Sequence, residues 1–369
     1  MKPLSKIKVL DFTTLLPGPL ATLMLCEAGA EIIKVEKIGG EEMRKAKPLI
    51  GNESILFAML NRGKKSIEIN LKNKDSLKKI KTLIKGCDVL VEQFRPGVMD
   101  KLGLGWKTVK KLNSKLVYCS ITGYGQNGEK YKKAGHDINY LAESGLLRLS
   151  TAKDGSPIVP ITQIADIAGG TYPAFMNILL ALFKSQRQGL GSYIDVSMYE
   201  NLIPLAWLGL SQNINGSFNS KSRLHLNGGL ARYNIYKTKD KKFIALGALE
   251  NKFWLKFCQI IKAPQEVISE KGSQKSLINK VQKIIEEKNE NFWKKKFDKE
   301  NDVCCTVIND LNDFMKDSHI KNKKLFENNV IINKKKLSSI PTVLDKSLIK
   351  AKITSKAPKL GQNNNLIKK

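Results

Sequence analysis

Short apolar runs alternate with amphipathic stretches through the first half of the chain. The runs have the length of buried strands, and we predict strands over residues 7–12, 31–36, 66–71, 88–93 and 116–121. Helical spacing predicts helices over 19–28 and 74–84, the first with Gly29 just beyond its end. This order predicts an α/β fold whose large domain is Rossmann-like, with a mostly parallel sheet. No G-x-G-x-x-G follows the first strand, so we do not expect a dinucleotide site.

The pattern changes after about residue 211. Before it we predict a long helix over 166–184, a strand over 193–196 and an apolar helix over 199–210. After it come an Asn-, Ser- and Gly-rich stretch, a hairpin formed by 233–236 and 243–247, and lysine-rich helices. We therefore expect a large domain over 1–211, a linker over 212–232, a smaller α+β domain over 233–327, and a C-terminal segment over 328–369 that returns to the large domain.

We expect no targeting signal at either end of the chain, and we expect the longest apolar run, 172–183, to be too short to cross a bilayer. We expect a cytoplasmic protein with no membrane partner. The net charge of +29 suggests nucleic acid, but the lysines are spread along the whole chain without interleaved aromatic residues. We expect no nucleic-acid partner. The six cysteines are scattered without metal-ligand spacing, which predicts free thiols and no metal site.

Histidine and arginine are scarce enough for their positions to be informative. The three histidines include His136, which precedes a carboxylate, and Asp166 begins a Gly-rich apolar segment. A histidine and a carboxylate are suitable acid/base groups, although each alone also fits a structural role, as a core histidine or a helix-start aspartate. Arg62 and Arg95 follow predicted elements where anions often bind, and a surface salt bridge is the alternative for each.

Several short motifs occur in order along the chain, at residues 13–19, 60–66, 94–97, 123–128, 135–140, 165–170, 247–250 and 357–361. Together they resemble the family III acyl-CoA transferases. The intact Gly-His-Asp-Ile-Asn-Tyr at 135–140 is similar to the α-methylacyl-CoA racemase branch, because true transferases usually carry an aromatic residue in place of His136.

The resemblance implies inversion of the α-carbon of 2-methylacyl-CoA thioesters by proton transfer through an enolate. His136 and Asp166 would be the acid/base groups on opposite faces, and Glu250 would orient and charge-balance His136. Amides at the start of the helix after Asp166, aided by Gly169 and Gly170, would stabilise the enolate oxygen. The alternative is a CoA-transferase in which Asp166 is the nucleophile.

Coenzyme A would be part of the substrate, so no separate cofactor is expected. Its phosphates need cations, and the residues expected to bind or shape the CoA site are Arg62, Arg95, Lys34, Lys65, Asp137 and Tyr140. The resemblance also implies an interlaced homodimer that takes Glu250 from the second subunit. Glu143 departs from the racemase pattern, and it either alters the site or points to water.

Overall fold

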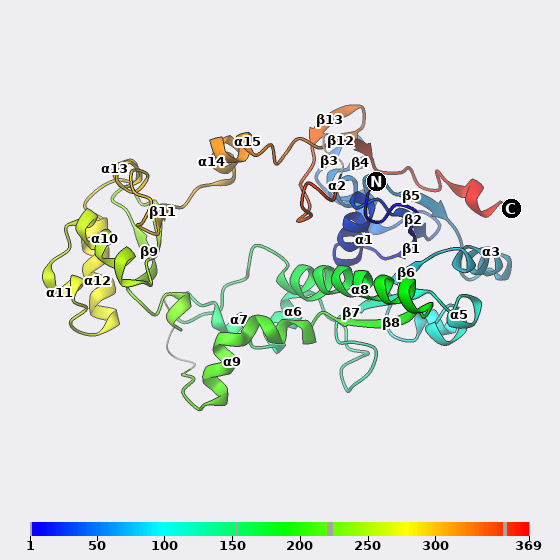
Figure 1. Cartoon of the computed structure of the whole chain (residues 1–369), viewed down its shortest axis with the longest axis horizontal. Helices are drawn as coiled ribbons and strands as arrows, with labels where there is room; N and C mark the ends of the chain where they lie inside the picture. Colours follow the sequence, from blue (N-terminus) through cyan, green and yellow to red (C-terminus); the bar gives the residue numbers. More distant parts are fainter. Residues whose placement is uncertain (1, 153, 220–223, 350–352, 369) are drawn as a thin grey trace. The chain divides into compact units, whose positions relative to one another are not determined.

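The computed structural model describes residues 2–152, 154–219, 224–349 and 353–368, and it divides the chain into two compact units (Figure 1). Unit 1 comprises Met1–Leu146, Val159–Leu205 and Lys323–Lys369. Unit 2 comprises Leu147–Ile158 and Ala206–Asn322. These units have other bounds than the large domain predicted over 1–211 and the linker predicted over 212–232. Residues 220–223 of that linker lie outside the described residues.

Unit 1 is built on a six-stranded parallel sheet. Its strands are β1 (Lys8–Phe12), β2 (Glu31–Glu36), β5 (Lys65–Glu68), β6 (Val89–Glu92), β7 (Val117–Thr122) and β8 (Ser192–Ser197), in the order β5-β2-β1-β6-β7-β8. This confirms the predicted α/β class. The strand order reverses between β1 and β6, and the crevice beyond the carboxyl ends of two such strands is where open α/β sheets bind ligands.

Helices cover both faces of this sheet (Figure 1). On one face, α1 (Pro17–Glu27) packs against α8 (Tyr172–Gln188), which also lies along β7 and β8. On the other face, α3 (Lys74–Lys85) and α5 (Trp106–Leu112) bury apolar side chains against alternate strand residues such as Leu10. The side-chain period of two along each strand therefore supplies both layers of the core.

A π-helical turn, η2 (Ala165–Thr171), runs directly into α8, giving one helical stretch over Ala165–Gln188. By length and composition this stretch is long and apolar enough to cross a membrane, the one such helix in the part of the chain that the structure describes. The apolar run over 172–183 lies within this longer helix. A single such helix is weak grounds for a span, because core helices share these properties, and 44% of its most apolar window is buried.

Shorter elements of the large unit connect these layers. They are η1 (Glu42–Lys45), β3 (Leu49–Ile50), β4 (Glu53–Ser54), α2 (Ile55–Asn61), α4 (Val98–Lys101) and α6 (Asp137–Glu143). α7 (Leu146–Leu149) and η3 (Glu200–Ala206) lie where the chain passes between units. The predicted helix over 199–210 is two elements, η3 and α9 (Trp207–Ile214), because Pro204 interrupts regular α-helix.

Unit 2 contains an antiparallel sheet of order β11-β10-β9, with β9 (Tyr233–Lys237), β10 (Phe243–Gly247) and β11 (Cys305–Val307). The predicted hairpin is confirmed by the pairing of β9 with β10. Trp254 and Phe257 lie at the centre of the unit's core. The remaining elements are η4 (His225–Asn227), α10 (Asn251–Ile261), α11 (Gln265–Ile268), α12 (Gln274–Ile285), α13 (Glu290–Phe297), α14 (Leu311–Lys316) and α15 (Ser318–Asn322).

The C-terminal segment belongs to unit 1. It forms a small sheet of order β13-β12-β14 from β12 (Asn329–Ile332), β13 (Lys335–Ser338) and β14 (Thr354–Lys356), and it ends in η5 (Asn364–Ile367). Ser66 N and Glu68 N, on edge strand β5, donate to the side chains of Asn363 and Asn364. The segment thus covers the open edge of the parallel sheet, which would otherwise present unpaired backbone groups.

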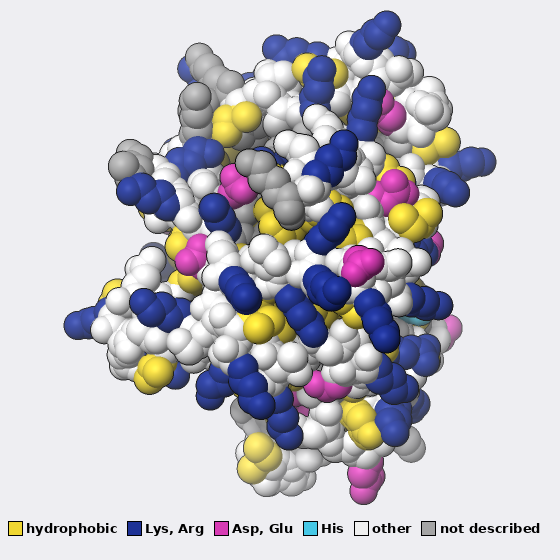
Figure 2. All heavy atoms as spheres, turned by 90° about the vertical axis from the view of Figure 1, so that its right-hand side faces the viewer, with side chains coloured by type: hydrophobic (Ala, Val, Ile, Leu, Met, Phe, Trp, Pro, Cys, Tyr) yellow, Lys and Arg dark blue, Asp and Glu magenta, His cyan; other side chains and the backbone are white. Residues whose placement is uncertain are grey.

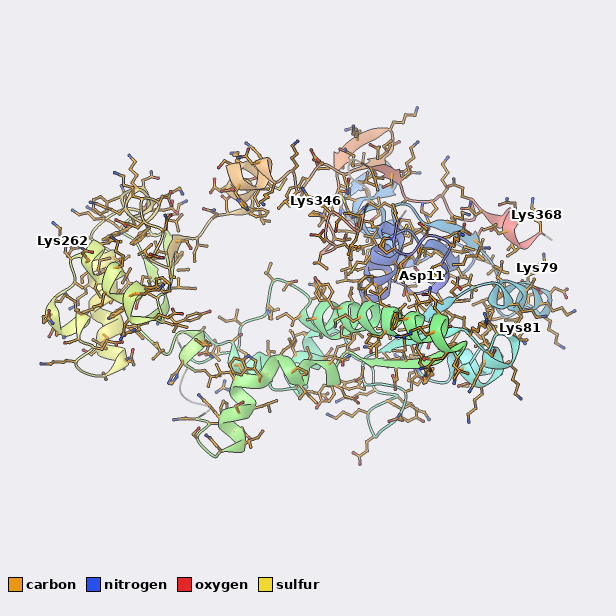
Figure 3. All side chains as sticks on the ribbon, viewed as in Figure 1. Asp11, Lys79, Lys81, Lys262, Lys346 and Lys368 are labelled. Carbon is orange, nitrogen blue, oxygen red and sulfur yellow. The ribbon has the colours of Figure 1, made fainter. Side chains whose placement is uncertain are left out.

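Lysine and arginine side chains are scattered over the face of the molecule in Figure 2. In Figure 3, Lys79 and Lys81 of α3 point outward, whereas Asp11 lies inside unit 1. Lys34 and Lys64 depart from this pattern, because their side chains are completely buried. A buried ammonium group requires charged or hydrogen-bonding partners, and both lysines have them.

Candidate active site

A pocket of about 510 Å³ opens at the carboxyl ends of β1, β6, β7 and β8, where the strand order reverses. This volume lies within the range of small-molecule sites. The walls come from the loops that follow these strands, from α6 and from the start of η2; the lining residues are Thr14, Leu15, Pro17, Gln93, Phe94, Arg95, Pro96, Ile121, Thr122, Gly123, Tyr131, Lys132, Lys133, Ala134, Gly135, His136, Asn139, Tyr140, Asp166 and Met198.

The turn after β1 forms one wall, and buried ionic groups hold it. Lys34 Nζ donates to the carbonyl of Thr13 at 2.7 Å and pairs with the Glu41 carboxylate at 3.0 Å. Glu41 in turn accepts the amide of Leu15, whose φ of +63° lies in the left-handed region. Lys34, predicted to bind CoA, is therefore engaged inside the protein and does not line the pocket.

A second buried pair lies beneath the same turn. Lys64 Nζ lies 3.2 Å from Asp11 Oδ2 and also donates to the hydroxyl of Thr22 in α1. Burial opposes ionisation of Asp11, but Lys64 and Lys34, together with hydrogen bonds from Thr13 and Thr22, outweigh it and lower its pKa to about 2. The charged network ties β1, α1 and the strand that follows α2 together beneath the pocket.

The first turn of α6 places His136 on the pocket wall. Its ring is exposed, so His136 is not a core histidine. Its backbone amide donates to Asn139 Oδ1 at 3.0 Å, which fixes the start of the helix. Tyr140 donates from its hydroxyl to the carbonyl of Gly135 at 2.5 Å and packs edge-on against Tyr124. The predicted pocket residue Tyr140 thus lines the pocket and shapes the loop before His136.

Asp166 reaches the same pocket from the start of η2. Its carboxylate makes no hydrogen bond or ion pair with any residue that the structure describes, so it does not act as a helix cap. The pKa of Asp166 is raised to about 6, first by burial and next by the Asp137 carboxylate, against a lowering by His136. A carboxyl group with this pKa is suited to proton transfer near neutral pH.

The amides near Asp166 are not available for an enolate oxygen. Asp166 N donates to Asp137 Oδ1 at 3.0 Å, and Ile167 N donates to the carbonyl of Gln163 at 3.0 Å. The paired glycines after them serve packing, because a Cβ on Gly169 would lie 2.4 Å from the Met198 carbonyl oxygen. Asp137 therefore lies behind the pocket wall as the partner of the Asp166 amide.

Of the predicted phosphate-binding cations, the structure brings Arg95 to the pocket. Arg95 is exposed, and its guanidinium group has no ion pair or hydrogen bond among the described residues. Arg62 is buried, pairs with Glu27 at 2.6 Å and donates to two backbone carbonyls, whereas Lys65 pairs with Glu31 at 2.9 Å. Neither Arg62 nor Lys65 lines this pocket.

Sequence reasoning missed three groups on the pocket wall. Lys132 and Lys133 lie on the loop before His136, where the run Lys-Tyr-Lys-Lys after a Gly-rich turn was the available signal. Thr122, at the end of β7, has a buried hydroxyl with no hydrogen-bond partner among the described residues. A buried hydroxyl of this kind usually meets a water molecule or a ligand.

Glu250 belongs to unit 2, at the residue before α10, and its side chain is exposed. The loop that carries it is held by Arg232, which donates to the carbonyl of Leu249 at 2.8 Å. Arg232 is itself fixed by a two-bond pair with Glu270 at 3.0 and 2.6 Å. The loop is therefore anchored to the core of its own unit.

No cluster of three or more histidine, cysteine, aspartate or glutamate side chains suited to a metal ion occurs among the described residues. All six cysteines are free thiols, and Cys304 is the exposed one. The ionisable groups that line the pocket include an imidazole, a carboxyl group and cations, which suits acid/base or acyl-transfer chemistry on an anionic ligand.

The profile of CoA-transferase family III matches residues 4–364 of the chain. Succinyl-CoA:glutarate CoA-transferase of Mus musculus is 35% identical over 267 residues, covering 72% of this chain and 61% of that enzyme. Alpha-methylacyl-CoA racemase of Mus musculus is 32% identical over 326 residues, covering 87% of this chain and 81% of the racemase. The crystal structure of Rv3272 from Mycobacterium tuberculosis has a TM-score of 0.85 at 26% identity, over 100% of this chain and 99% of that one.

Proposed function

Because the chain belongs to CoA-transferase family III, we propose that it acts on acyl-CoA thioesters in the pocket around His136 and Asp166. The reaction that we favour is inversion at the α-carbon of a 2-methylacyl-CoA. The observation that carries this choice is the exposed His136 ring in the same pocket as an Asp166 carboxyl group of raised pKa. The 32% identity with a racemase supports it.

In the proposed reaction, one of the two groups removes the α-proton and the other returns a proton to the opposite face. The thioester carbonyl becomes an enolate between these steps, and a buried donor would stabilise its oxygen. The amides of Asp166 and Ile167 are already bonded, so the unpaired Thr122 hydroxyl is our candidate for this donor.

The CoA phosphates would be bound by Arg95 with Lys132 from the facing loop, because Lys133 is paired with Glu143. No separate cofactor enters this scheme.

We further propose a cytoplasmic, interlaced homodimer in which the partner subunit's Glu250 orients His136. This proposal rests on the family resemblance alone. Size-exclusion chromatography with light scattering tests it, and a monomer with full activity would refute it.

A CoA-transferase is the second candidate, favoured by the unpaired Asp166 carboxylate and by the 35% identity with a transferase. Asp166 would attack the thioester carbonyl and expel the CoA thiolate, forming a mixed anhydride. The thiolate would then attack the Asp166 carbonyl, releasing the first acid and leaving an enzyme–CoA thioester for the acceptor acid.

One experiment separates the two reactions. The protein is incubated in D₂O with a 2-methylacyl-CoA and no acceptor acid, and deuterium at the α-carbon is measured by mass spectrometry. Rapid exchange that is lost in His136→Ala supports the racemase. Absence of exchange, with CoA transfer to an added carboxylic acid and hydroxylamine-sensitive loss of activity at Asp166, would overturn the racemase in favour of the transferase.

A further inference from the structure

The loop between β7 and α6 forms a wall of the pocket and has few backbone hydrogen bonds of its own. Residues 131–136 line the pocket, and the loop has no helix or strand of its own. Its internal backbone bonds are short-range turns, such as Lys133 N to the carbonyl of Lys130 at 2.8 Å. Something outside the loop backbone must therefore fix its position.

Glu143, at the end of α6, makes the contacts that reach this loop. One carboxylate oxygen accepts from Lys130 Nζ at 2.7 Å, and the other accepts from Lys133 Nζ. The second oxygen also accepts the hydroxyl of Tyr124, from the start of the loop, at 3.2 Å. Glu143 thus contacts the loop near both of its ends, in addition to the Tyr140 hydroxyl, which donates to the carbonyl of Gly135, and the Asp195 carboxylate, which accepts the amide of Gln126 at 2.9 Å.

Aromatic packing continues the same arrangement. Lys130 lies 4.9 Å from the centroid of the Tyr199 ring and 6.0 Å from that of Tyr124. The three hydrogen bonds also lower the pKa of Glu143 to about 2, so its carboxylate stays charged throughout the neutral range. Protonation of Glu143 therefore does not switch these contacts near neutral pH.

We infer that Glu143 is a positioning residue, whose ion pairs with Lys130 and Lys133 hold the 124–135 loop in place as the wall of the acyl-CoA pocket. Its role rests on the proposed function, since the benefit is a pocket already shaped for the thioester. Glu143 also pairs with the Lys133 side chain at the end of α6. Lys132 is then the pocket-lining lysine of this loop that has no acidic partner among the described residues.

The expected size of the effect follows from the exposure of the pair. The lysine side chains are about half exposed, and one exposed ion pair shifts an equilibrium by roughly 1.4- to 5-fold. Two such pairs together give roughly 2- to 25-fold. We expect loss of both to open the loop and raise the KM for acyl-CoA by a factor inside this range, roughly 3- to 10-fold, while kcat changes by less than about 2-fold.

The test compares wild type with Glu143→Gln and with Glu129→Gln. Glu129 is an exposed residue of the same loop with no ion pair among the described residues, so its variant changes the net charge equally without touching the contacts. Trypsin cleavage after Lys130, Lys132 and Lys133 is followed by mass spectrometry on the full chain without substrate, and KM and kcat are measured separately.

We expect Glu143→Gln to be cleaved roughly 3- to 10-fold faster and to show the higher KM, and Glu129→Gln to match wild type. Equal cleavage of Glu143→Gln and wild type, or faster cleavage with an unchanged KM, would overturn the inference. In a Lys130→Gln/Lys133→Gln background, Glu143→Gln should have no further effect on KM, and an added effect would also count against it. Trypsin cleavage does not depend on enzymatic turnover. If wild type and all variants are inactive on acyl-CoA, the proposed function is wrong, and the cleavage rates alone then test whether Glu143 holds the loop.

Discussion

Replacement of Asp137 by asparagine should shift the pH dependence of catalysis toward acid. The asparagine Oδ1 can still accept the Asp166 amide, which the aspartate accepts at 3.0 Å, so the local structure should persist. What changes is the negative charge beside the Asp166 carboxyl group. That charge is one of the two causes that raise the pKa of Asp166.

The magnitude follows from the pKa itself. A rise from 3.8 to about 6 corresponds to roughly 3 kcal/mol against ionisation in the folded protein. Burial is the larger cause, so removal of the Asp137 charge should account for less than half, or about 1 pKa unit. If Asp166 acts as a carboxylate, its ionised fraction at pH 5.5 would rise about threefold, with no change at pH 8.

The assay is the pH profile of kcat/KM for deuterium exchange at the α-carbon, or for CoA transfer if that is the activity found. The acidic limb should move from about pH 6 to about pH 5 in Asp137→Asn. The Glu129→Gln variant, which loses an exposed carboxylate, serves as the control. An unchanged acidic limb in Asp137→Asn, or a shift toward higher pH, would refute the assignment of the raised pKa to this pair of carboxylates.

Three further predictions concern stability. Asp166→Asn should raise the free energy of unfolding at pH 7 by about 1–3 kcal/mol, measured by urea melts. The gain should vanish near pH 4. The pKa of Asp166 in the folded protein lies above its ordinary value, so the carboxyl group destabilises the fold only at pH values where it ionises. Thr122→Val should stabilise by about 1 kcal/mol in thermal melts, since the buried hydroxyl has no partner in the described structure, and destabilisation would show a hidden one. Arg232→Gln should destabilise unit 2 by about 1–3 kcal/mol, measured by urea titration, because it removes the bonds to Glu270 and Leu249. It should also lower kcat in steady-state kinetics by loosening the loop that carries Glu250. An unchanged kcat would show that Arg232 does not act on catalysis through this loop.

The parallel sheet was predictable because its strands are buried on both faces and therefore consist of nearly continuous apolar runs. The predicted strand over 31–36 coincides with β2, and the predicted helix over 74–84 lies within α3. The short elements of the C-terminal segment were not predicted, because their three- to four-residue strands have no distinct periodicity. Strands that short are defined by their partners rather than by their own residues.

The residues around the pocket were predictable only where a motif also determined the local backbone. His136 and Asp166 each begin a helical segment, and both line the pocket. The cations were harder, since the pairing of Arg62 with Glu27 depends on how segments far apart in the chain pack. Glu27 and Arg62 are 35 positions apart, so the spacing of residues around either one does not indicate the pair.

The return of the C-terminal segment to unit 1 has a consequence for synthesis of the protein. Residues 323–368 leave the ribosome after the whole of unit 2, yet they supply the side chains that cover β5 and the carbonyl of Ile340 that accepts a hydrogen bond from Arg62. Unit 2 has its own contiguous core and can fold during elongation. The nascent large unit must instead wait with an exposed strand edge until translation reaches its last residues, and during that interval it is a natural client for chaperones.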